Sequence, residues 1–155
     1  MTTNEYLKAF LAVMPLSYEV NRSFQINRPY AICADGFGVS IQASDTHYCN
    51  PRISQFPEKD FVPYTKVELG YPTEADDDLL DYQECPGMED PTESVYGYVP
   101  VEVVDKVLEK HGGIDILKTR ARFEEHFLPF ERNEPDFVSM SKAFDSLIGG
   151  ELRGR

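Results

Sequence analysis

The fold of this chain is decided by residues 30–44, which read YAICADGFGVSIQAS. An Asp35-Gly36 pair separates two β-prone runs in this stretch. Such a pair is a hairpin turn signal, because glycine adopts the positive φ that a tight turn requires. In the second arm Val39 and Ile41 alternate with small polar residues, which is the period of a half-buried strand. The stretch therefore predicts a β-hairpin over 30–44 with one buried face and one polar face.

A third strand is predicted over 64–71, where Val67 and Leu69 lie in phase, and a short fourth one over 95–99. Because the first three strands follow one another through loops, they should form an antiparallel meander. Residues 15–29, which contain Asn21-Arg22-Ser23 and Arg28-Pro29, are predicted to be a connecting segment.

Helices are predicted on both sides of the strands. Residues 6–14 show an apolar stripe at helical spacing that ends at Pro15, and a clear amphipathic helix begins at Pro100 and stops at Gly112. Two more helices are predicted over about 115–127 and 139–148. The sequence therefore predicts an α+β fold, in which an antiparallel β-meander packs with N-terminal and C-terminal helices.

Length and composition fit one soluble globular domain spanning 1–155. Apolar residues make up 41% of the chain and charged residues 27%, which is ordinary globular usage. We expect no membrane association, because no apolar run is long enough to cross a bilayer, and no export, because the N-terminus does not read as a secretory signal. Cys33, Cys49 and Cys85 are widely spaced, so we expect free thiols and a cytoplasmic location.

The negative charge is concentrated in the middle of the chain. The net charge is −12, from 27 acidic and 15 basic residues, and no Lys or Arg lies between Lys66 and Lys106. That stretch holds twelve acids, so the rest of the chain is neutral overall. We predict irregular structure over about 72–94, with one helical turn near 78–82. An anionic segment of this kind repels nucleic acid and anionic membranes and attracts basic partners.

Two interpretations of this segment stay open from the sequence. It is either a solvated loop that serves solubility or a surface that binds a basic protein. Tyrosines interleave with the acids, a composition suited to protein binding, although a tyrosine-rich core edge fits equally well. The predicted partner-binding residues are Glu74, Asp76, Asp77, Asp78, Asp81, Tyr82, Glu84, Glu89, Asp90 and Glu93.

No catalytic motif or cofactor motif is present, and we predict neither catalytic residues nor a cofactor. His47 and Cys49 are candidate metal ligands, but the paired spacing typical of zinc sites is missing. One alternative is therefore a small metal-dependent hydrolase around His47 and Cys49. Another is a module that binds a nucleotide or another small ligand through the polar face of 38–44 and His47, with phosphate partners Arg22, Arg28 and Arg52.

Part of the chain, about residues 30–113, resembles small uncharacterised proteins of bacteriophages and prophages. The similarity lies in ADGF at 34–37, VSIQAS at 39–44, HYCNPR at 47–52, YTKVELG at 64–70, VPVEVV at 99–104 and HGG at 111–113. The resemblance implies a phage context and transfers no catalytic residue. In that context we expect an accessory protein in the bacterial cytoplasm that binds and inhibits a basic host protein, for example a defence protein or a nucleic-acid-binding enzyme, through its acidic surface.

Overall fold

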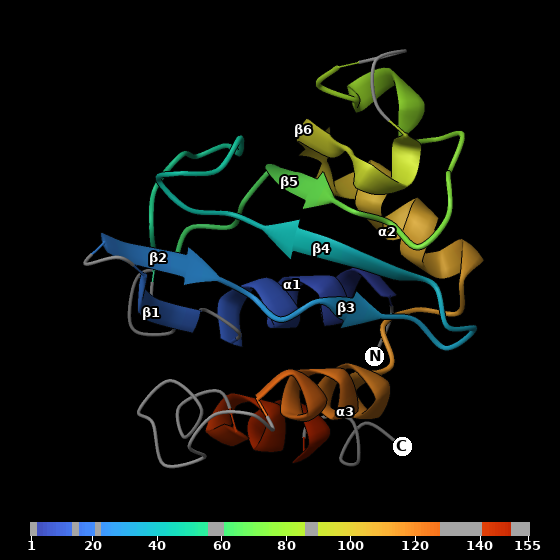
Figure 1. Cartoon of the computed structure of the whole chain (residues 1–155). Helices are drawn as coiled ribbons and strands as arrows, with labels where there is room; N and C mark the ends of the chain where they lie inside the picture. The colour runs from blue at the N-terminus through green and yellow to red at the C-terminus, as the bar shows by residue number, and fades with distance from the viewer. Residues whose placement is uncertain are drawn as a thin grey trace.

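The structure, a computed structural model, describes residues 3–13, 16–20, 23–55, 61–85, 90–127 and 141–149 (Figure 1). It is an α+β fold, as the sequence predicts. The elements are α1 (Thr3–Val13), β1 (Leu16–Val20), β2 (Ser23–Asn27), β3 (Ala31–Ile32), β4 (Gly38–Gln42), β5 (Lys66–Gly70), the 3₁₀ turns η1 (Leu80–Tyr82) and η2 (Pro91–Glu93), β6 (Val95–Pro100), α2 (Val101–Lys110), α3 (Ile116–Phe127) and a helix over 141–149.

A four-stranded antiparallel sheet has the order β3-β4-β5-β6. The predicted hairpin forms its first two strands, and the strand predicted over 64–71 forms the third. Gly36 has φ 97° in the turn, and the Cys33 N–H donates to the Phe37 carbonyl at 2.7 Å. The Asp-Gly turn thus fixes the register in which Ala31 faces Val39.

The prediction of a connecting segment over 15–29 is wrong for most of its length. β1 and β2 form a second, two-stranded antiparallel sheet whose register runs from Leu16 opposite Asn27 to Val20 opposite Ser23. The two strands are joined by Asn21-Arg22, a pair that lacks the glycine of a common hairpin signal. The hairpin therefore depends on pairing between the two strands, and the residues of its turn do not predict it.

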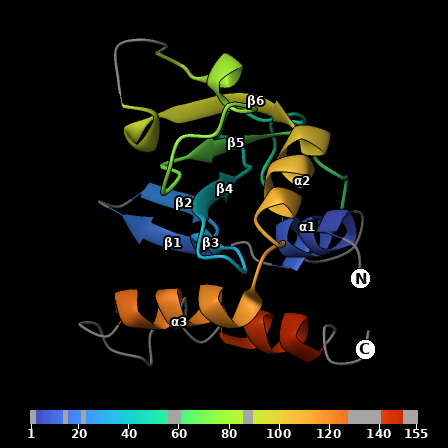
Figure 2. The ribbon, with the colours of Figure 1, turned by 90° about the vertical axis from the view of Figure 1, so that its right-hand side faces the viewer.

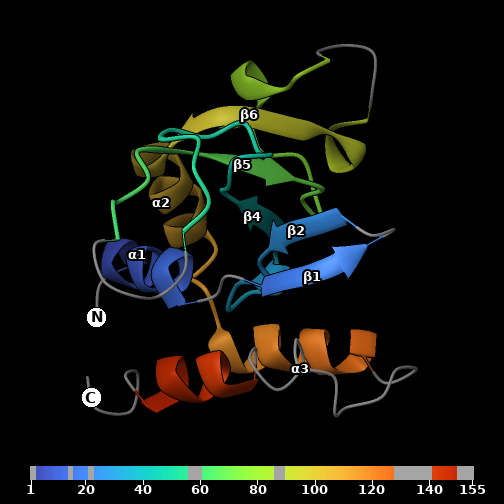
Figure 3. The ribbon, with the colours of Figure 1, turned by 90° about the vertical axis from the view of Figure 1, so that its left-hand side faces the viewer.

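Helices α1 and α2 lie together on one face of the four-stranded sheet, and α3 runs beneath with the helix over 141–149 (Figures 2 and 3). The core between α1, α2 and the sheet includes Phe10, Ile41, Leu69 and Leu108, each at most 1% exposed. The predicted start of the helix at Pro100 is one residue early. Pro100 is extended, with ψ 139°, and ends β6.

Both edges of the four-stranded sheet are covered. At the β3 edge the Thr119 hydroxyl accepts from the Ile32 N–H at 3.0 Å, and the Asp115 N–H donates to the Ile32 carbonyl at 2.8 Å. At the β6 edge the Glu84 N–H donates to the Val95 carbonyl at 3.0 Å. Covered edges leave fewer backbone groups to pair with other chains. The acidic segment therefore lies along β6, at the end of the sheet away from α3 (Figure 1).

A β-bulge interrupts the pairing of β5 with β6. Val67 faces Val99 and Leu69 faces Tyr96, so both Gly97 and Tyr98 lie opposite the single residue Glu68. Bulges bend a strand and redirect a side chain. Tyr98 has φ 52°, in the left-handed region that bulky residues seldom adopt.

Candidate functional site

Two of the predicted partner-binding acids anchor the acidic segment to α2. Asp76 is buried, at 6% exposure, and its two carboxylate oxygens lie 2.9 and 2.8 Å from Lys110 Nζ. The same ammonium lies 2.9 Å from Asp78 Oδ2, and Lys106 Nζ lies 3.5 Å from Asp78 Oδ1. The hydrogen bond from Lys110 holds the pKa of Asp78 below its usual value. These two acids therefore build the segment rather than present charge to a partner.

His111 extends this anchor to the hairpin turn. Its Nδ1 lies 2.7 Å from Asp35 Oδ2, and its Nε2 lies 3.6 Å from Asp76 Oδ2. The imidazole also stacks on Phe37, with ring centroids 3.9 Å apart and an interplanar angle of 6°. The end of α2, the turn of the hairpin and the start of the acidic segment are thus held together at one point.

The remaining described acids of the segment face solvent. None of these six carboxylates has a Lys, Arg or His partner within 4.0 Å in the described part of the chain, whereas the anchoring acids have several. The predicted Glu89 lies outside the described residues, and Tyr82 is half-buried. We call the exposed set the acidic face, and its members are Glu74, Asp77, Asp81, Glu84, Asp90 and Glu93.

The acidic face has a defined backbone. The predicted helical turn is present as η1, in which the Tyr82 N–H donates to the Leu79 carbonyl at 2.9 Å. The Asp90 carboxylate caps η2 by accepting from the Thr92 N–H at 2.8 Å. The hydrogen bond from the Thr92 hydroxyl, together with this N–H, lowers the pKa of Asp90. In the described residues 72–85 and 90–94, the irregular structure predicted from the sequence therefore contains two ordered turns.

The tyrosines near the acids divide between the core and the surface. Tyr64 and Tyr96 are buried and belong to the core, whereas Tyr71 and Tyr98 are among the most exposed large side chains of the described residues. Tyr48 is exposed too, and no sequence pattern pointed to it. Composition alone could not separate these two groups, because both border the same acidic stretch.

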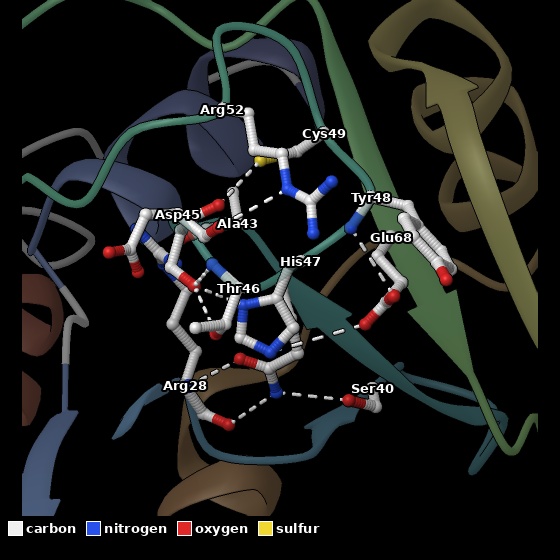
Figure 4. A network of polar contacts seen from close by, with 12 residues as sticks. Arg28, Ser40, Ala43, Asp45, Thr46, His47, Tyr48, Cys49, Arg52 and Glu68 are labelled. Carbon is white, nitrogen blue, oxygen red and sulfur yellow. Dashed lines mark hydrogen bonds and ion pairs between the residues drawn. The ribbon is translucent and has the colours of Figure 1, made fainter. Parts of the chain in front are cut away.

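A second polar network lies on the face of the sheet that α1 and α2 leave uncovered (Figure 4). His47 Nδ1 lies 2.6 Å from Ser44 Oγ, and its Nε2 lies 4.0 Å from Glu68 Oε2. A serine, an imidazole and a carboxylate are the parts of a hydrolytic triad. Here Ser44 is fully buried and its hydroxyl already accepts from the Thr46 N–H, so it cannot reach a substrate.

Among the described residues, His47 and Cys49 are not joined by a third side chain that could complete a metal site. Cys49 is buried, its thiol contacts the Ser44 carbonyl at 3.1 Å, and burial raises its pKa. Among the described residues no group of three His, Cys, Asp or Glu side chains could hold a metal ion. The three cysteines are free thiols, with Cys33 and Cys49 buried and Cys85 exposed. Burial raises the pKa of Cys33 to about 12.

The predicted phosphate partners that the structure describes, Arg28 and Arg52, make contacts within the chain. Arg28 is buried and donates to backbone carbonyls, Arg22 lies outside the described residues, and Arg52 reaches over the Tyr48 ring. A cavity of about 280 Å³ lies elsewhere, between α1 and residues 61–64. Its lining is mostly apolar, so it does not match a nucleotide phosphate.

Comparison with known proteins finds no matching family model, no matching curated protein and no matching solved structure. The resemblance to phage proteins therefore stays a prediction. In the part of the chain that the structure describes, no helix combines the length and the apolar character needed to cross a bilayer.

His47 makes stability depend on pH. Burial, with a smaller contribution from the charge of Arg28, lowers its pKa in the folded protein. The unfolded chain therefore binds more protons near and below the ordinary histidine pKa, and stability falls as the pH drops through that range. We expect His47→Gln to flatten the decline in urea stability between about pH 7 and pH 5. Parallel pH profiles for the two proteins would contradict this assignment.

Proposed function

We propose that this protein is a non-enzymatic binding protein whose acidic face binds a basic surface on another protein. The proposal rests on the observation that the acids of the segment fall into two groups, one that anchors the segment and one that is exposed. Asp76 and Asp78 bind Lys106 and Lys110 and fix the segment to α2, while the six acids of the acidic face remain exposed.

This arrangement favours binding over solubility. A loop that serves only solubility needs charge but no fixed geometry, whereas here a buried carboxylate, the turn η1 and the capped turn η2 hold the acidic face in place. Ordering the segment before association lowers the conformational entropy lost on binding. Neighbouring carboxylates repel one another in the free protein, and a basic partner relieves that repulsion.

The partner should be a basic protein. An anionic surface on a rigid fold can take the place of nucleic acid phosphates, so a nucleic-acid-binding enzyme has a suitable surface. In the phage context that the sequence resemblance implies, the partner is a host protein of the bacterial cell, and occupation of its basic surface inhibits it.

The test is a pull-down from bacterial lysate at about 0.1 M and again at about 0.5 M salt. We expect one basic protein to be retained at low salt and lost at high salt, because screening shortens the range of exposed charges. The double variant Asp77→Asn with Asp81→Asn should lose this protein. Neither residue contacts a basic group in the described part of the chain, so the fold should be unaffected.

The matched control is Glu102→Gln with Glu125→Gln. Both residues are exposed, lie on α2 and α3, and their replacement removes the same number of charges. The control should retain the partner. Equal loss in both double variants would show that only net charge matters, and equal retention would show that the acidic face is not the binding surface.

A further inference from the structure

The bulge in β6 places two tyrosine rings side by side on the surface next to the acidic face. The Tyr98 N–H turns away from β5 and donates to the Tyr48 carbonyl at 3.0 Å. The two rings stack with centroids 5.8 Å apart at 28°, yet Tyr48 and Tyr98 stay 40% and 44% exposed. The left-handed backbone at Tyr98 is therefore used to present a ring to solvent, away from the core.

The carboxylates of Glu84 and Glu68 both lie close to Tyr48. A Cβ atom at Gly97 would collide with Glu84 Oε1 and lie 3.2 Å from Tyr48 Cβ, so the Glu84 carboxylate and Tyr48 converge over this glycine. On the other side of Tyr48, Glu68 Oε1 accepts from the Tyr48 N–H at 3.3 Å. Burial raises the pKa of Glu68, and the charge of Glu84 raises it further.

This tyrosine pair already contacts one guanidinium. The Arg52 guanidinium carbon lies 5.4 Å from the centroid of the Tyr48 ring, at the distance of a cation–π contact. Arg52 also donates to the Asp45 carbonyl, which ties it to its own loop. No Lys or Arg of the described residues lies within 4.0 Å of the Glu84 or Glu68 carboxylates. The Tyr98 ring and Glu84 thus remain available to a cation from outside.

We propose that Tyr48, Tyr98, Glu68 and Glu84 form a site for an arginine side chain of the protein partner. The site rests on the proposed function and adds a specific contact to it. A guanidinium is planar, stacks on aromatic rings and donates to carboxylates in a fixed fork, so it suits this site better than an ammonium. The acidic face then attracts the basic partner over a long range, and this arginine site favours arginine over lysine at the point of contact.

The test uses hexa-arginine and hexa-lysine peptides as probes of the isotope-labelled protein by NMR titration. We expect hexa-arginine to shift the amide signals of Tyr48, Gly97 and Tyr98 most strongly, and to bind more tightly than hexa-lysine. Tyr98→Ala should weaken hexa-arginine binding by about two- to fivefold, the range of an exposed cation–π contact. Tyr98→Phe keeps the ring and should bind like the parent protein.

Gly97→Ala and Glu84→Gln test the carboxylate. The first keeps the charge but displaces the flexible end of Glu84, and the second keeps the shape but removes the charge. Both should reduce the preference for arginine over lysine. Tyr71→Ala and Glu102→Gln are the matched controls, since they remove an exposed ring and an exposed carboxylate outside the site, and they should leave the preference unchanged.

Failure of this site is distinguishable from failure of the acidic face. Largest shifts confined to residues 74–81, equal affinity for the two peptides, or full binding by Tyr98→Ala would each overturn the arginine site. If the double variant Asp77→Asn with Asp81→Asn nevertheless failed to retain the cellular partner, the proposed function would stand and only the arginine site would be withdrawn.

Discussion

Replacing Arg28 with methionine should lower the free energy of unfolding by about 3 kcal/mol. Arg28 is only 3% exposed, and its guanidinium holds two parts of the chain together. Nε and Nη2 donate to the Leu11 carbonyl at 3.2 and 2.7 Å, and Nη1 donates to the Ala43 carbonyl at 2.8 Å. The Leu11 carbonyl lies in the last turn of α1, where no helical N–H can reach it.

Methionine fills much of the same volume but donates no hydrogen bond, so both carbonyls lose their donor inside the fold. Each unsatisfied buried acceptor costs about 1–3 kcal/mol, which sets the size of the expected loss. The measurement is urea denaturation followed by circular dichroism.

Arg120→Met is the matched control for Arg28→Met. Arg120 pairs with Glu124 at 3.0 Å and with Asp145 at 2.8 Å on the surface, where ion pairs contribute at most about 1 kcal/mol. A loss at Arg28 no larger than that at Arg120 would refute the structural role given to the buried guanidinium.

The sequence predicted the elements whose signals are local. The Asp35-Gly36 turn, the alternation through Val39 and Ile41, and the stop at Gly112 each depend on a few neighbouring residues. It missed β1 and β2 because these strands are stabilised by pairing with each other, and the turn between them carries no common hairpin signal. It also missed the bulge at Tyr98, where contact with Tyr48, fifty residues earlier in the chain, overrides the backbone preference of tyrosine.

For the candidate site, the sequence predicted which residues are acidic but not which of them are buried and which are exposed. The sequence located the acids but treated all of them alike, although Asp76 is buried and Asp77 is exposed. The difference depends on Lys110, which lies 34 residues beyond Asp76. One signal was available: Lys106 and Lys110, four apart on an amphipathic helix, form one basic edge directly after a stretch with no basic residue.

Asp76→Ala should lower the free energy of unfolding by about 2 kcal/mol. The variant removes the carboxylate that binds Lys110 and accepts from the Asp78 N–H at 2.9 Å. Hydrogen bonds to a buried charged group contribute about 1.5–3 kcal/mol. The Lys110 side chain is 42% exposed, so water screens part of this ion pair, and we expect a value in the lower part of the range.

Asp77→Asn is the matched control one residue along the chain. Asp77 is exposed, so its replacement should change stability by no more than about 0.5 kcal/mol. Urea denaturation gives both values. Equal stability losses would mean that Asp76 does not anchor the segment and that the acidic face lacks the support we assign to it.

The two variants should also differ in how they affect partner binding. Asp77→Asn removes one of the charges of the acidic face and leaves the fold intact. It should therefore weaken partner binding at low salt, where charge attraction is least screened. Asp76→Ala leaves every carboxylate of the acidic face in place but frees the start of the segment from α2, so binding must then order a looser surface. We therefore expect Asp76→Ala to weaken binding at low salt although it removes no charge from the acidic face. Unchanged binding by Asp76→Ala, with its stability loss present, would show that the partner does not need the acidic face in the fixed geometry that this anchor provides.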